Sequence, residues 1–129
     1  MTEPNTHLLI NPELVGTPTA LAPGRAEVEL STTPSMAADE RGLVHGGFIF
    51  GLADYAAMLA VNDPFVVLGA ADTRFTKPVV VGDTIRAKAE VQEESGKKRV
   101  VSVTAERGDD IVFEGTFTCF VLPAHVLGT

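Results

Sequence analysis

The stretch Gly46–Asn62, GGFIFGLADYAAMLAVN, decides the fold of this 129-residue chain. It contains one charged side chain, Asp54, and four alanines, which favour helix strongly. Asp63 and Pro64 predict where the helix ends, because the residue before a proline avoids the helical region of φ/ψ space. A membrane-spanning helix needs about 20 apolar residues, so this shorter, interrupted run predicts a buried helix of a soluble protein. Apolar residues on every side of it predict that other elements enclose it.

The segments flanking the helix alternate apolar and polar residues, which is typical of antiparallel strands with one buried face. We expect strands over Arg25–Thr33, Val66–Phe75, Ile85–Glu94, Val101–Glu106 and Ile111–Val121. In the last strand the odd-numbered residues, including Ile111 and Cys119, are expected to face the core. The predicted fold is therefore α+β, with a long helix wrapped by an antiparallel sheet of about five strands. Residues 1–129 form one predicted domain, in which residues 1–23 are an N-terminal extension.

The charge distribution limits the classes of partner. Ten Lys and Arg against seventeen Asp and Glu give a net charge of −7, which argues against a nucleic-acid binder because such a protein needs a basic surface. Residues 1–73 carry nine acids and two bases, whereas residues 74–129 carry eight of each. An anionic ligand would therefore find cations in the second half.

Cysteine usage and the N-terminus bear on the compartment. The single cysteine cannot form an internal disulfide, and the N-terminus lacks a secretory pattern. We expect a cytoplasmic protein with no membrane partner. The spacing of the three histidines and Cys119 suggests no metal site.

The start of the helix combines features that suit carbonyl chemistry. Two glycines, Gly46 and Gly47, would leave backbone N–H groups accessible at the positive end of the helix dipole. Such a site can stabilise a carbonyl oxygen as it becomes an oxyanion. Asp54 lies about two turns further on, on roughly the same face, where a carboxylate could attack a polarised carbonyl or activate a water molecule. Apolar surroundings would tend to raise its pKa.

Two motifs resemble a known family. His45-Gly46-Gly47 followed by Leu52-Ala53-Asp54 resembles the HGG…D signature of hotdog-fold acyl-CoA thioesterases, especially the phenylacetate-degradation type. The segment Arg74-Phe75-Thr76-Lys77-Pro78, followed by Val81-Gly82-Asp83, resembles the strand-end segment of the same fold. The resemblance covers residues 24–122.

The resemblance implies roles for particular residues. Asp54 would be the nucleophile or the general base, the Gly46 amide beside Gly47 the oxyanion donor, and His45 an orienting group. It also implies a homodimer, or a tetramer of such dimers, joined through sheet edges, with sites at the interface that use Asp54 of one chain and residues near Thr76 of the other.

The ligand expected is an acyl-CoA substrate, and no separate cofactor is expected. Further candidate substrate-binding residues lie around the helix start, at the end of one strand and in a basic turn that could contact CoA phosphates: Asp39, Phe48, Arg74, Thr76, Lys77, Lys97, Lys98 and Arg99.

The sequence departs from the family at two positions, so alternatives stay open. Relatives often carry Asn where this chain has Asp39, and Ser or Thr where it has Lys77. A non-catalytic acyl-CoA-binding or regulatory protein is therefore an alternative to a thioesterase. A hotdog dehydratase or hydratase is less favoured, because its usual histidine and carboxylate pattern is not recognisable. The segment before the first expected strand has no helix-turn-helix pattern, which disfavours a regulator with its own DNA-binding domain.

Overall fold

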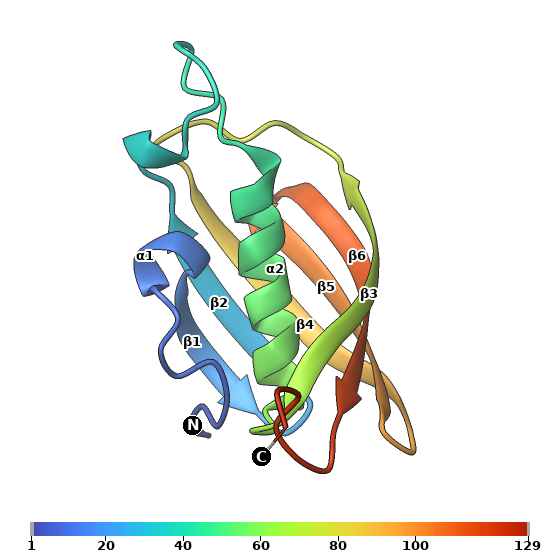
Figure 1. The fold of residues 1–129 in the computed structure, drawn as a ribbon. Helices are drawn as coiled ribbons and strands as arrows, with labels where there is room; N and C mark the ends of the chain where they lie inside the picture. The colour runs from blue at the N-terminus through green and yellow to red at the C-terminus, as the bar shows by residue number, and fades with distance from the viewer. Residues whose placement is uncertain (1, 129) are drawn as a thin grey trace.

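The computed structural model describes residues 2–128, in which a long helix lies across a twisted antiparallel sheet (Figure 1). The sheet order is β1-β2-β4-β5-β6-β3. In chain order the elements are α1 (Pro12–Val15), β1 (Thr17–Ala22), β2 (Arg25–Ser31), the 3₁₀ turn η1 (Pro34–Met36), α2 (Gly46–Val61), β3 (Val66–Phe75), β4 (Thr84–Ser95), β5 (Lys98–Arg107) and β6 (Asp110–Val121).

Helix α2 confirms the prediction from the opening stretch. It ends at Asn62, which adopts a left-handed conformation (φ 54°) and donates its backbone N–H to Met58 O at 2.7 Å. Nine of its residues are buried, and they pack on the inward faces of the strands, including the fully buried Phe113 and Phe117 of β6. The helix is thus enclosed, as its apolar surface requires.

Within residues 2–128 the sheet has six strands, one more than expected. The additional strand, β1, lies within residues 1–23, which the sequence indicated only as an extension. It is an edge strand in which Leu21 is the sole buried residue, so it shows little alternation. The segment before it is also structured: Asn62 holds it through hydrogen bonds with Asn5 N (2.7 Å) and Glu3 O (2.9 Å).

The odd-numbered residues of β6 were expected to face the core, and only some of them do. Phe113, Phe117 and Cys119 are fully buried, but Ile111 is 41% exposed. The pairing of β5 with β6 shifts between Ala105 and Glu106, so that Val112 has no direct partner. This β-bulge turns Ile111 outward and buries Val112 instead.

Strand β3 forms the second edge of the sheet, and no other strand of residues 2–128 pairs with its outer side. Ala71 and Phe75 pair with the buried residues Phe117 and Phe113, yet both are exposed. The start of α2 and the end of β3 lie at one end of the molecule, and the β4–β5 turn lies at the other (Figure 1). Within residues 2–128, no helix combines the length and hydropathy needed to cross a bilayer.

Candidate functional site

The first turn of α2 presents two free amides. His45 is the N-cap residue, and its own backbone N–H donates to Met36 O at 3.0 Å. The Gly46 and Gly47 N–H groups lie in the first turn, where no intrahelical acceptor exists, and nothing within residues 2–128 hydrogen-bonds to them. They can therefore receive a ligand oxygen at the positive end of the helix dipole.

The two glycines of this turn leave room for neighbouring rings. A Cβ on Gly46 would lie 3.1 Å from Phe75 Cε2, and one on Gly47 would lie 3.0 Å from His45 Nε2. The Phe75 ring therefore rests directly against the helix start. The exposed His45 ring lies edge-on to Phe48, with centroids 6.1 Å apart.

An apolar hollow of about 330 Å³ lies beside the Gly46 amide. Its lining comes from the loop before α2, the first turns of α2, the end of β3 and the following loop, and the β6 bulge: Leu43, Val44, Gly46, Ile49, Phe75, Thr76, Lys77, Pro78, Val79 and Val112. This volume lies at the small end of the range for ligand pockets. The hollow could hold an acyl group while its carbonyl oxygen faces the free amide.

Two predicted residues of the strand end line this hollow but have protein partners. Thr76 donates its hydroxyl to Ile111 O at 2.7 Å, and its backbone N–H donates to Val112 O at 2.9 Å. Lys77 Nζ donates to Asp110 Oδ1 at 2.7 Å, and this hydrogen bond holds the pKa of Asp110 below its usual range. Thr76 and Lys77 therefore attach the end of β3 to β6.

Asp54 is the unusual group on α2. Its Oδ1 atom is buried and has no hydrogen-bond partner within the described residues. Burial raises its pKa to about 6. Burial, and secondly the charge of Asp54, raise the pKa of the Cys119 thiol on β6 to about 12. An unpaired carboxylate oxygen is costly to bury, so this position calls for a partner that the single chain does not supply.

Asp54 and the Gly46 amide lie at different levels of the same helix. Gly46 and Asp54 are eight residues apart on one uninterrupted helix, which separates them by roughly 12 Å along its axis. Asp54 does not line the hollow beside Gly46. One carbonyl group cannot contact both residues of the same chain.

Asp39 and Phe48 also lie outside that hollow. The Asp39 carboxylate accepts the backbone N–H groups of Arg41 (3.0 Å) and Leu43 (3.2 Å). It thereby stabilises the turn that leads into α2, a common use of aspartate in loops. Phe48 is half-buried against the core.

The predicted basic residues are spread over the sheet. Lys97 and Lys98 are exposed at the β4–β5 turn, while Arg99 pairs with Glu94 (3.4 Å) and donates to Gly96 O (2.7 Å). This turn is at the opposite end of the molecule from Gly46 (Figure 1). Arg74 lines a separate hollow on the outer face of the sheet.

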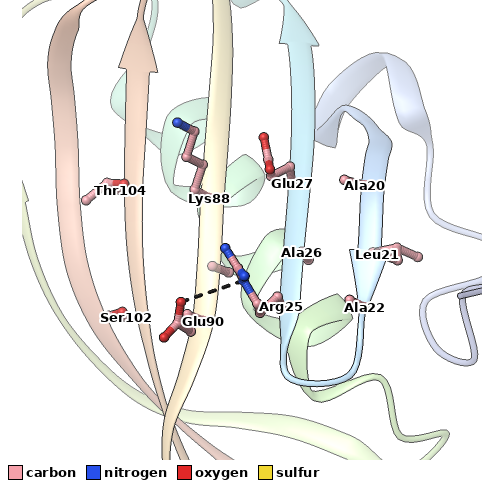
Figure 2. Close-up of a pocket in the computed structure, with 11 residues that line it drawn as sticks. Ala20, Leu21, Ala22, Arg25, Ala26, Glu27, Lys88, Glu90, Ser102 and Thr104 are labelled. Carbon is pink, nitrogen blue, oxygen red and sulfur yellow. Dashed lines mark ion pairs between the residues drawn. The ribbon is translucent and has the colours of Figure 1, made fainter. Parts of the chain in front are cut away.

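A larger hollow, of about 460 Å³, lies on the outer face of β1, β2, β4 and β5 (Figure 2). Its charged residues, Arg25, Glu27, Lys88 and Glu90, include an Arg25–Glu90 ion pair at 3.7 Å. It contains none of the predicted site residues. We therefore place the candidate site at the start of α2. Within residues 2–128, no three His, Cys, Asp or Glu side chains converge as a metal site would require.

Known proteins share this fold and much of the sequence. The family model of the fluoroacetyl-CoA-specific thioesterase matches residues 65–125. An uncharacterized protein of Pyrococcus horikoshii is 58% identical with a TM-score of 0.96, and the match covers 98% of this chain and 97% of that one. A mutant of the phenylacetic acid degradation protein PaaI of Thermus thermophilus is 29% identical with a TM-score of 0.78, over 86% of this chain and 97% of that one.

Two curated relatives are longer proteins. The methylthioribose-1-phosphate isomerase of Aquifex aeolicus is 58% identical over 118 residues, which are 91% of this chain and 26% of that protein. Transcription factor FapR of Caldanaerobacter subterraneus subsp. tengcongensis is 30% identical over 120 residues, which are 92% of this chain and 60% of that protein. The chain thus spans only part of these relatives.

Together, the fold, the HGG…D segment and these matches show that the chain has the hotdog fold and is similar to the acyl-CoA thioesterases with that fold.

Proposed function

We propose that this protein hydrolyses acyl-CoA thioesters to a free acid and CoA. The observation that carries the proposal is the buried, unpaired Oδ1 of Asp54 on an otherwise apolar helix. With its pKa raised to about 6, this carboxyl group is largely ionised at neutral pH and is a stronger base than an exposed aspartate. The free amide at Gly46 and the apolar hollow supply the other two requirements, an oxyanion donor and a place for the acyl group.

The reaction can follow two routes with these groups. The Asp54 carboxylate can take a proton from water, and the resulting hydroxide attacks the thioester carbonyl. Alternatively, the carboxylate attacks directly and forms an anhydride that water then cleaves. In both routes the Gly46 N–H stabilises the oxyanion, and collapse of the intermediate breaks the C–S bond. The CoA thiolate then takes up a proton.

A second copy of the chain would complete the site. The free edge of β3 can pair antiparallel with the same edge of another copy, forming a continuous sheet and covering Ala71 and Phe75. Such a two-fold axis reverses the direction of the second helix, so that Asp54 of one copy can approach Gly46 of the other. Sedimentation at assay concentration tests this arrangement, because a monomer would contradict it.

The same two-fold axis would bring the partner copy's β4–β5 turn to the end of the assembly that holds the helix start. Lys97 and Lys98 could then contact the CoA phosphates. Replacing both with Ala should raise the KM for acyl-CoA several-fold and weaken its dependence on salt. Titrations at low and high ionic strength measure this. An unchanged KM and salt dependence would mean that the turn is only solvated surface.

The decisive test of hydrolysis is thiol release from a panel of acyl-CoA substrates. The wild type should release thiol, and Asp54→Asn should lower kcat at least a hundredfold while CoA binding persists. Gln92→Glu, a matched acid–amide exchange on an exposed strand residue, should leave kcat unchanged. Equal rates in wild type and Asp54→Asn would contradict the proposal.

A non-catalytic binding module is the second candidate. The match to FapR, a transcription factor, shows that this fold also occurs within a regulatory protein. CoA binding without turnover of any thioester would favour this candidate.

A further inference from the structure

The Phe75 side chain occupies a position at the helix start that no catalytic role explains. It is the last residue of β3, and 54% of it is exposed although it is a large apolar residue. Its ring edge lies so close to Gly46 that a Cβ there would be 3.1 Å from Cε2. The ring therefore stands next to Gly46, whose amide would bind the thioester oxygen, and both residues line the hollow.

The ring is held in place from two directions. It packs edge-on against the fully buried Phe113, with centroids 5.1 Å apart, a favoured arrangement of aromatic pairs. The next residue is fixed to the β6 bulge by two hydrogen bonds, from Thr76 N to Val112 O and from Thr76 Oγ1 to Ile111 O. The chain at Phe75 is therefore anchored to β6, and one side of the ring packs against the core.

A substrate would pass close to this ring. Gly46 and Phe75 both line the hollow, so an acyl group that occupies it while its carbonyl oxygen accepts from the Gly46 N–H would lie near the Phe75 ring. Beyond the ring, the hollow of about 330 Å³ is bounded by Val44, Ile49, Val79 and Val112. An apolar group fits this lining, and the volume restricts its size.

We infer that Phe75 is a specificity-determining residue that limits the length of the apolar acyl group that the site accepts. This inference rests on the proposed thioesterase function and deepens it. The ring acts by excluding long acyl chains from the hollow, so shortening the side chain should extend the range of substrates. A difference of a few methylene groups in a binding pocket changes the ratio of kcat/KM values for two substrates by roughly one to two orders of magnitude.

The test compares kcat/KM for propionyl-CoA and decanoyl-CoA. In Phe75→Ala the ratio of the decanoyl value to the propionyl value should rise at least tenfold above that of the wild type. Phe75→Leu, which keeps most of the bulk, should change the ratio less than threefold. Leu14→Ala is the matched control, because Leu14 is a partly exposed apolar residue (41%) on α1, which packs against β2 and α2 and away from the β3 edge.

Binding measurements separate this inference from the proposed function. The dissociation constants of propyl-CoA and decyl-CoA thioethers, which cannot be hydrolysed, should show the same change of preference in Phe75→Ala. Hydrolysis by the wild type with an unchanged ratio in folded Phe75→Ala would overturn the inference and leave the function standing. Absence of hydrolysis with a shifted thioether preference would overturn the function and support the role of Phe75. A wild type that binds neither thioether would overturn both.

Discussion

At the scale of single residues, Asp54 is notable because its carboxyl group lies in apolar surroundings. Its neighbours on the helix are apolar, and one carboxylate oxygen is buried without a partner in the described chain. Structural positions rarely keep such a group, since a well-packed apolar side chain would be more stable there. The unfavourable burial of the Asp54 carboxylate is thus an argument for function that does not depend on the resemblance in sequence.

The raised pKa of Asp54 predicts a pH-dependent cost in stability. Because the pKa is near 3.8 in the unfolded chain and about 6 in the folded one, the unfolded chain loses this proton first as pH rises. The contribution of the protonated Asp54 carboxyl to the free energy of unfolding is fully present below pH 4 and is lost as pH rises through 6. Asp54→Asn, which stays neutral, should therefore be more stable than the wild type at pH 8 by up to about 3 kcal/mol.

Urea unfolding of both proteins at pH 4.5 and pH 8 measures this effect. The difference in unfolding free energy between Asp54→Asn and wild type should be larger at pH 8. Comparing the two proteins at each pH removes the contributions of the other carboxyl groups. A difference that does not depend on pH would show that Asp54 titrates normally and would remove the argument for a strained carboxylate.

At the scale of elements, two glycines of α2 are expected to differ in role: Gly46 matters for activity, and Gly51 affects only stability. Gly46 touches the Phe75 ring, whereas a Cβ on Gly51 would lie 3.8 Å from Val15 Cγ1, an ordinary contact. Gly51→Ala should stabilise the protein by about 0.5–1 kcal/mol, because alanine loses less backbone entropy than glycine in a helix interior, with thioester hydrolysis unchanged. Gly46→Ala should lower kcat/KM at least tenfold, because its methyl group displaces the ring and crowds the amide.

Thermal unfolding and thiol-release assays on the two variants check this pair. Since both make the same chemical change in the same helix, a general effect of Gly→Ala would appear in both. Equal activity in Gly46→Ala and Gly51→Ala would contradict the placement of the oxyanion site at the start of α2.

The sequence predicted the elements that composition, alternation or a stop signal marks locally, and it missed those that lack such a signal. Helix α2 and strand β3 were predicted with their observed limits, to within one residue, because composition and the Asp63-Pro64 stop specify them locally. Strand β1 was missed, since only Leu21 in it is buried and the pattern that marks a strand is absent. The outward turn of Ile111 depends on a bulge created by pairing with β5, which no local pattern shows.

The candidate site was predictable to a similar extent. The free Gly46 and Gly47 amides and the anomalous Asp54 follow from local sequence. The ion pair that occupies Lys77 and the hydrogen bonds that occupy Thr76 depend on the distant β6 and could not be predicted. The contact of Phe75 with Gly46 was missed for the same reason, although an aromatic residue at the end of an exposed strand was a usable signal.

At the scale of the whole molecule, the helix geometry decides how the site is shared. Because roughly 12 Å of continuous helix separates Gly46 from Asp54, the proposed reaction would use Gly46 from one copy and Asp54 from another. Two inactive variants should therefore complement each other. A mixed dimer of Asp54→Asn with Gly46→Ala contains one site with both defects and one site with neither.

Co-expression of the two variants with different affinity tags isolates this mixed dimer. It should show about half of the wild-type kcat per dimer, since one of the two sites of a two-fold symmetric assembly is intact. Each variant purified alone should stay at its own low rate, and wild type carrying both tags controls for the tags. Activity in the mixed dimer no higher than the mean of the two variants would mean that the two residues do not act across the interface. In that case the reaction could not use both groups, because within one chain the helix holds Asp54 too far from a carbonyl bound at Gly46.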